Sequence, residues 1–170
     1  MKKTIIAITG NKATGKTTIA EMISEQTGIP FFDIKTYLSK VNSRGSRDDI
    51  IKAWKLLNSE IKGSNIAILE TSGLSSFEQA FYNRFDQKII IRMECPNEHI
   101  LLKRIENDLE KYHFPSGISI QRSAKAWLPI IKRNDKLYNN IKSDMVFNTI
   151  AMNAVNIVNE IKLHISLILK

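Results

Sequence analysis

Short apolar runs alternate along the chain with longer segments in which apolar residues recur every three or four positions. Residues 4–9 are apolar without alternation, which indicates a strand buried on both faces, and residues 16–27 have the pattern of a helix. This alternation predicts a parallel sheet with helices on both faces. The expected strands are 4–9, 31–33, 65–70, 88–93 and 145–148, and the expected helices are 16–27, 47–62, 97–112, 121–141 and 151 to about 169.

The 170 residues contain no internal repeat, low-complexity tract or linker that would divide them. We therefore expect a single domain over residues 1–170, a three-layer α/β/α fold built on a five-stranded parallel sheet. Pro115 and Gly117 mark an irregular stretch between two expected helices. Cys95 is the only cysteine, and no run reaches the length of a membrane span. These features predict a cytoplasmic protein without disulfides and without a membrane partner.

One motif carries specific chemistry. Residues 10–17 satisfy the pattern G-x-x-x-x-G-K-[ST] in full, between the first expected strand and the first expected helix. Glycine at positions 10 and 15 lets successive backbone N–H groups turn inward around a phosphate, and the helix that follows adds the positive end of its dipole. Lys16 is expected to reach the β- and γ-phosphates, and the Thr17 hydroxyl is expected to bind Mg²⁺. The predicted cofactors are ATP and Mg²⁺, and the predicted nucleotide-binding residues here are Gly10, Asn11, Lys12, Ala13, Thr14, Gly15, Lys16, Thr17 and Thr18.

Two acidic residues, Asp33 and Glu70, fall at the ends of expected strands. Open parallel sheets bind their ligands at the carboxyl ends of the strands. Either carboxylate can therefore hold Mg²⁺ or deprotonate an acceptor, and the alternative for each is a helix cap. We assign Thr17 and Asp33 to the metal, and we leave open which of the two acids is the base.

The net charge of +8 is concentrated in two windows. Residues 35–55 carry six basic residues against two acidic ones, and residues 113–142 carry six against one. Clustered positive charge attracts anions, so nucleotides, phosphorylated metabolites or nucleic acid are the expected partners, although solvated helix faces would look the same.

The sequence resembles the small P-loop kinases of the shikimate, gluconate and nucleoside monophosphate kinase type. The resemblance rests on the P-loop, on residues 31–38 (FFDIKTYL), on residues 89–105 (IIIRMECPNEHILLKRI) and on the tail from Arg133 to Thr149. It implies a nucleoside kinase-like fold with a lid at about 113–128. It also implies roles for individual residues. Arg104 would pack on the adenine beside Asn148 and Thr149, Arg122 and Arg133 would act on the transferring phosphate, and Thr71, Ser72 and Gly73 would line the acceptor pocket.

The sequence departs from this family at Lys35. Shikimate-type kinases have a second acid two residues after the position of Asp33, and this chain has a cation there. A cation cannot be the general base, so shikimate itself is disfavoured. With Arg44 and Arg47 following in the sequence, Lys35 favours an acceptor that carries phosphate or carboxylate.

Together these features predict an enzyme, an ATP-dependent phosphotransferase that acts on a small anionic acceptor. Lys16, Asp33, Glu70, Arg122 and Arg133 are the expected catalytic residues. The alternatives are a polynucleotide 5′-hydroxyl kinase and an ATP-binding regulatory module without kinase activity; nucleic acid is a possible partner that we do not favour. The sequence leaves the oligomeric state and the identity of the acceptor open.

Overall fold

A computed structural model describes residues 2–110 and 119–168 of the chain. Its centre is a five-stranded sheet in the order β2-β3-β1-β4-β5, and every neighbouring pair is parallel. The strands are β1 (Thr4–Gly10), β2 (Phe31–Asp33), β3 (Ile66–Glu70), β4 (Gln87–Glu94) and β5 (Met145–Asn148). All five predicted strands are therefore present, and the predicted α/β architecture is confirmed.

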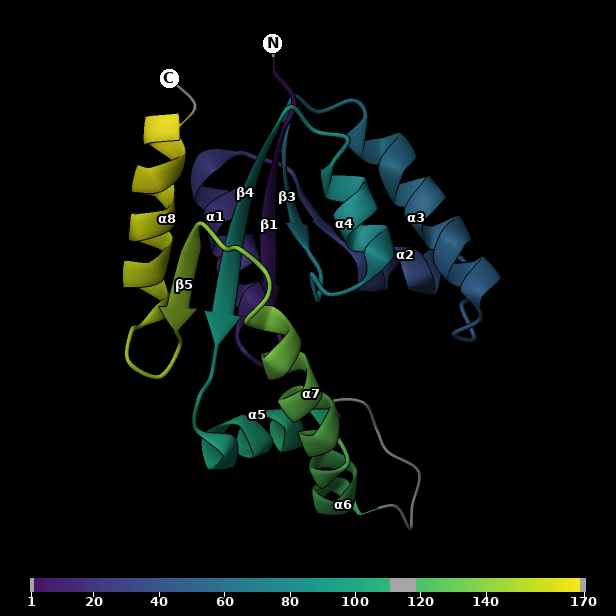
Figure 1. The fold of residues 1–170 in the computed structure, drawn as a ribbon, viewed down its shortest axis with the longest axis vertical. Coiled ribbons are helices and arrows are strands. Elements are labelled where there is room, and N and C mark those ends of the chain that lie inside the picture. Colours follow the sequence, from purple (N-terminus) through teal and green to yellow (C-terminus); the bar gives the residue numbers. More distant parts are fainter. Residues whose placement is uncertain (1, 111–118, 169–170) are drawn as a thin grey trace.

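Helices cover both faces of the sheet (Figure 1). On one face lie α1 (Lys16–Thr27) and α8 (Ala154–Ile168), and on the other lie α2 (Ile34–Lys40), α3 (Arg47–Ile61) and α4 (Ser76–Tyr82). The remaining helices, α5 (Glu98–Glu110), α6 (Ile120–Lys125) and α7 (Leu128–Tyr138), gather beyond the carboxyl end of β4. None of the helices in the described ranges is long and apolar enough to cross a membrane.

The central strand β1 shows why the fold needs helices on both sides. All of its residues are buried, and successive side chains point to opposite faces. Ile6 and Ile8 belong to the core that packs against α1 and α8, whereas Ile5 and Ala7 belong to the core that packs against α3 and α4. Trp54, on α3, is 9% exposed and belongs to the second core.

The prediction of one helix over residues 121–141 is wrong. The chain forms α6 and α7 instead, separated at residues 126–127. Pro129 has no backbone N–H and cannot donate to the carbonyl of Lys125, so a continuous helix would lose a hydrogen bond at this point. Pro129 instead lies in the first turn of α7, where the missing donor costs nothing.

The last helix begins later than predicted, at Ala154. The Asn148 side chain accepts hydrogen bonds from the N–H groups of Ile150 and Ala151, which holds the intervening residues in a turn. The short helices α2 and α4 were not predicted. The first part of the predicted lid, residues 113–118, lies outside the described residues, as do residues 111–112 at the end of the predicted helix 97–112.

Candidate active site

The loop between β1 and α1 has the backbone geometry of a phosphate cradle. Gly10, Ala13 and Gly15 have positive φ angles of 137°, 61° and 88°. A Cβ atom on Gly10 would collide with the backbone carbonyl of Met93, so only glycine fits at this position. Gly15 caps α1 without a side-chain hydrogen bond, and no acidic residue occupies the first turn. The N–H groups at the start of α1 are therefore available to an anion.

Lys16 is folded inward against this loop. Its side chain is buried, and its Nζ donates to the backbone oxygen of Asn11 at 2.7 Å and lies 3.9 Å from Oε1 of Glu70. Burial lowers the pKa of Lys16 from 10.5 to about 8, and the nearby carboxylate of Glu70 opposes this shift only in part. A bound triphosphate would supply the negative charge that the buried ammonium group lacks.

Glu70, the last residue of β3, is hydrogen-bonded to Thr17 of the P-loop. It is 2% exposed and accepts hydrogen bonds from Oγ1 of Thr17 at 2.7 Å and from Nζ of Lys35 at 3.3 Å. Asp33 lies opposite Glu70 in the register of β2 and β3. The pKa of Asp33 is raised, mainly because burial disfavours its charge. Five predicted site residues thus lie close together at the carboxyl ends of the strands: Lys16, Thr17, Asp33, Lys35 and Glu70.

This group of residues fits magnesium. A hydroxyl and two neighbouring carboxylates are oxygen donors of the kind that Mg²⁺ prefers, and a cation would compensate the charge on Asp33. Among the residues that the structure describes, no three His, Cys, Asp or Glu side chains form a cluster for a metal ion. Mg²⁺ is commonly bound by one or two carboxylates and completes its shell with water and substrate phosphates.

Asp33 also has the structural role that the sequence left as an alternative. It is the N-cap of α2, and its Oδ1 accepts a hydrogen bond from the backbone N–H of Lys35 at 3.0 Å. This cap places Lys35 in the first turn of α2. The side chain of Lys35 is 68% exposed, while its Nζ remains in contact with Glu70. The cation therefore lies at the rim of the candidate site, where an incoming anion can reach it.

The loop after β3 is held in place by a residue that sequence reasoning missed. Buried Glu78 accepts hydrogen bonds from the N–H groups of Ser72 and Ser75 and from the Ser72 hydroxyl. The backbone oxygen of Ser72 accepts a hydrogen bond from the Tyr138 hydroxyl of α7 at 2.6 Å, and Thr71 bonds to the buried Tyr82. Ser75 and Glu78 form a capping box at the start of α4, a sequence signal that was available at this spacing.

The predicted adenine-binding residues Arg104 and Thr149 are in contact, and Asn148 directly precedes Thr149 in the chain. Arg104, on α5, donates to the Thr149 hydroxyl at 2.9 Å and to its backbone oxygen at 3.1 Å. Thr149 follows β5, so Arg104 and the turn that begins at Asn148 are side by side. Within the P-loop, Lys12 points away from the cradle, toward Asp108 at 3.2 Å and the ring of Trp127.

The remaining predicted arginines are exposed. Arg44 precedes α3, Arg47 is its first residue, Arg122 lies on α6 and Arg133 on α7. None of these four guanidinium groups makes an ion pair with another described residue, and none contacts the P-loop. Their roles in phosphate or acceptor binding stay predictions.

Comparisons with known proteins agree on the architecture. No protein-family model and no curated protein sequence matches the chain. Solved structures match it over almost its whole length. A shikimate kinase from Bacteroides thetaiotaomicron has a TM-score of 0.68 at 15% identity, and the match covers 96% of this chain and 98% of that one.

The chain has the fold of the shikimate kinase type of P-loop kinase. A gluconokinase from Sinorhizobium meliloti is also similar in structure, with a TM-score of 0.56 at 14% identity over 91% of this chain and 87% of that one. The YorR protein from Bacillus subtilis, in complex with phosphorylated GDP, matches with a TM-score of 0.62 at 12% identity over 96% of both chains. At these identities the comparisons establish the fold alone, and a fold does not by itself determine a function.

Proposed function

We propose that the protein transfers the γ-phosphate of Mg·ATP to a small anionic acceptor. The observation that carries the proposal is the contact of Lys16 and Thr17 with Glu70 beside an open phosphate cradle. Phosphoryl transfer depends on positioning and charge more than on covalent chemistry, and this arrangement supplies both. The kinase fold of the structural neighbours supports the same reaction class.

The hydrogen bonds suggest a division of labour between the two acids. Thr17 is the expected magnesium ligand, and its contact with Glu70 favours Glu70 as the acid nearer to the metal. Asp33, whose pKa is raised by burial, is better suited to accept the proton of an acceptor hydroxyl, because a stronger base is a better proton acceptor. Mg²⁺ would neutralise charge on the β- and γ-phosphates, and Asp33 would remain close enough to contact the metal through water. The ammonium group of Lys16 would stay in contact with the γ-phosphate during transfer.

The acceptor is proposed to carry a carboxylate or phosphate. Lys35 is exposed, lies beside both acids and occupies a position where a cation would bind an anionic group. Arg44 and Arg47 come after α2 in the chain, in the loop and at the start of α3, without ion-pair partners among the described residues. The structural neighbours include kinases named for shikimate and gluconate and a protein bound to phosphorylated GDP, so nucleotides and carboxylated metabolites should be tested first.

The experiment is a transfer assay with γ-labelled ATP, Mg²⁺ and acceptors in matched pairs, each anionic compound beside its uncharged analogue. We expect label on an anionic acceptor, and we expect Lys35→Ala to reduce the preference over the uncharged partner. Oligonucleotides with a free 5′-hydroxyl belong in the same panel. Labelling that requires an oligonucleotide and falls steeply with salt would favour the polynucleotide kinase instead. Label released only as inorganic phosphate, with every acceptor unmodified, would contradict a kinase.

A further inference from the structure

Helix α7 is attached to the candidate active site by polar contacts. The Tyr138 hydroxyl donates to the backbone oxygen of Ser72, in the loop after β3. The backbone oxygen of Tyr138 accepts a hydrogen bond from Arg92 of β4 at 2.8 Å. One turn earlier, α7 contacts the P-loop itself through Asn134 and Asp135. A single helix thus connects the phosphate cradle with the loop expected to contact the acceptor.

The contact with the P-loop is made by the side chain of Asn11. Asn11 is 6% exposed, and both ends of its amide group are occupied. Its Nδ2 donates to Oδ1 of Asp135 at 2.7 Å, and its Oδ1 accepts from Nδ2 of Asn134 at 3.0 Å. The two hydrogen bonds fix the position and the orientation of the amide.

The backbone oxygen of the same residue holds the loop together. It accepts hydrogen bonds from Nζ of Lys16 at 2.7 Å and from the hydroxyl of Thr14 at 2.9 Å. The chain of contacts therefore runs from α7 through Asn11 to the ammonium group that is expected to meet the γ-phosphate. A shift of Asn11 would move the anchor of Lys16.

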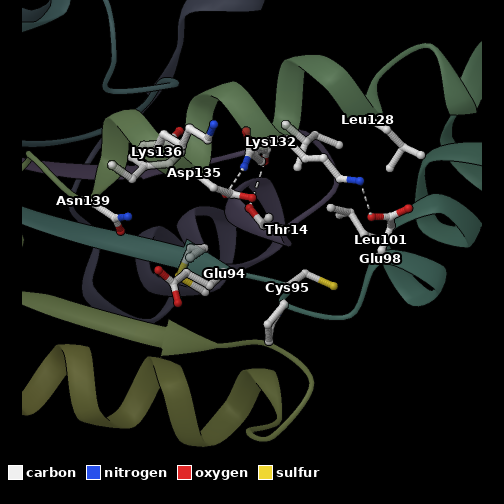
Figure 2. A pocket seen from close by; sticks show the side chains of 15 residues that line it. Thr14, Glu94, Cys95, Glu98, Leu101, Leu128, Lys132, Asp135, Lys136 and Asn139 are labelled. Carbon is white, nitrogen blue, oxygen red and sulfur yellow. Dashed lines mark hydrogen bonds and ion pairs between the residues drawn. The ribbon is translucent and has the colours of Figure 1, made fainter.

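A cavity lies beside these contacts. Its volume is about 370 Å³, and it is bounded by α7, the P-loop, the end of β4 and the start of α5. Figure 2 shows Thr14, Asp135, Glu94, Cys95 and Leu101 among the side chains that surround it. Ile131 of α7 belongs to a small apolar cluster against which Ala13 of the P-loop packs. The hydrogen bonds to Asn11 add directional polar contacts to this apolar one.

We propose that Asn134 and Asp135 are positioning residues, which set the P-loop geometry for nucleotide binding by holding Asn11. The expected effect on ATP binding rests on the proposed function. The link from α7 to Lys16 does not, because it is present in the free protein. Neither residue needs to touch the nucleotide. Their effect passes through the Asn11 amide to the backbone oxygen that anchors Lys16.

The test compares Asp135→Ala, Asn134→Ala and Asn11→Ala with the wild type. Each variant breaks at least one hydrogen bond of the buried Asn11 amide, so we expect Mg·ATP to bind about tenfold more weakly in each. The double variant Asn11→Ala/Asp135→Ala should bind no more weakly than Asn11→Ala alone, because both changes break one link. Asp135→Asn keeps an acceptor oxygen and should bind within about twofold of the wild type.

A second readout follows Lys16 directly. The NMR signal of its Cε methylene, assigned through Lys16→Met, should shift in the free Asp135→Ala and Asn134→Ala proteins and stay in place in Asp135→Asn. A purely structural role would lower the unfolding temperature without moving this signal. Lys136→Ala is the matched control, since Lys136 is exposed on the same turn of α7 and makes no hydrogen bond or ion pair with a described residue.

The outcomes separate the two proposals. Asp135→Ala and Asn134→Ala proteins that bind Mg·ATP like the wild type, with an unchanged Lys16 signal, would overturn the inference. Additive losses in the double variant would overturn it as well. A wild-type protein that binds no Mg·ATP would refute the proposed function, and the Lys16 signal of the free variants would still decide whether α7 sets the P-loop. If Asp135→Ala does not fold, Asn134→Ala and Asp135→Asn carry the test.

Discussion

Binding of Mg·ATP should be accompanied by proton uptake at Lys16. In the free protein, burial lowers the pKa of this side chain to about 8, so about half of the molecules carry a neutral amine at pH 8. A triphosphate in the cradle favours the ammonium form and raises the pKa again. The bound state therefore holds more protons than the free state, and affinity should decline as the pH rises above about 8.

The size of the effect follows from the shift itself. The lowering of the Lys16 pKa from 10.5 to about 8 means that the folded environment disfavours the ammonium form by about 3 kcal/mol, at about 1.36 kcal/mol for each pKa unit. Binding at pH 8 should take up about 0.5 proton for each ATP, and binding at pH 7 about 0.1. Well above pH 8 the affinity should fall by up to about tenfold for each pH unit, until the pKa of the complex is reached.

Isothermal titration calorimetry measures this uptake. Titrations at one pH in buffers with different ionisation enthalpies give the number of protons as the slope of the observed enthalpy. Lys12→Met is the control, because Lys12 belongs to the same loop but pairs with Asp108 outside the cradle, and this variant should keep the uptake. The absence of proton uptake between pH 7.5 and 8.5, or the same uptake in Lys16→Met, would refute the assignment of Lys16 to the phosphates.

Three further changes test other parts of the site. Asp33→Asn keeps an oxygen that can cap α2 but removes the base, so we expect the transfer rate to fall at least about a hundredfold with ATP affinity nearly unchanged; full activity would exclude Asp33 from catalysis. Lys35→Ala should raise the KM for an anionic acceptor about tenfold and leave the KM for ATP alone, and an equal effect on both would argue against an acceptor role. Gly73→Ala should lower the free energy of unfolding in urea by about 2 kcal/mol, because Gly73 has φ 75° and a Cβ would lie 2.6 Å from a Thr9 methyl. Gly63→Ala is its control, with nothing closer than 3.8 Å, and equal stability of the two variants would contradict the clash.

The sequence predicts the sheet well because its strands are unmistakable. Residues 5–8 of β1 are apolar without interruption, and burial on both faces of a parallel sheet is the simplest reason for such a run. The P-loop was equally clear, since Gly10 and Gly15 occupy two of its three positions with positive φ. These features depend on local residue types, which a sequence displays directly.

The contacts between distant segments could not be predicted in this way. Lys35 was expected to meet the acceptor, but nothing in the sequence indicates that its Nζ rests on Glu70. The hydrogen bonds between Asn11 and α7 join residues more than 120 positions apart. The partners of Asn11 on α7 are ordinary polar residues of an amphipathic helix. The break between α6 and α7 depends on a single proline within a pattern that otherwise reads as one helix.

Equilibrium dialysis of labelled ATP with Mg²⁺ against the folded protein tests the central claim most directly. We expect one ATP bound for each chain in the wild type and a loss of at least about tenfold in affinity in Lys16→Met, in which the expected contact of the ammonium with the phosphates is absent. A wild-type protein that is folded and yet retains no ATP, or a Lys16→Met protein that binds it equally well, would contradict this account.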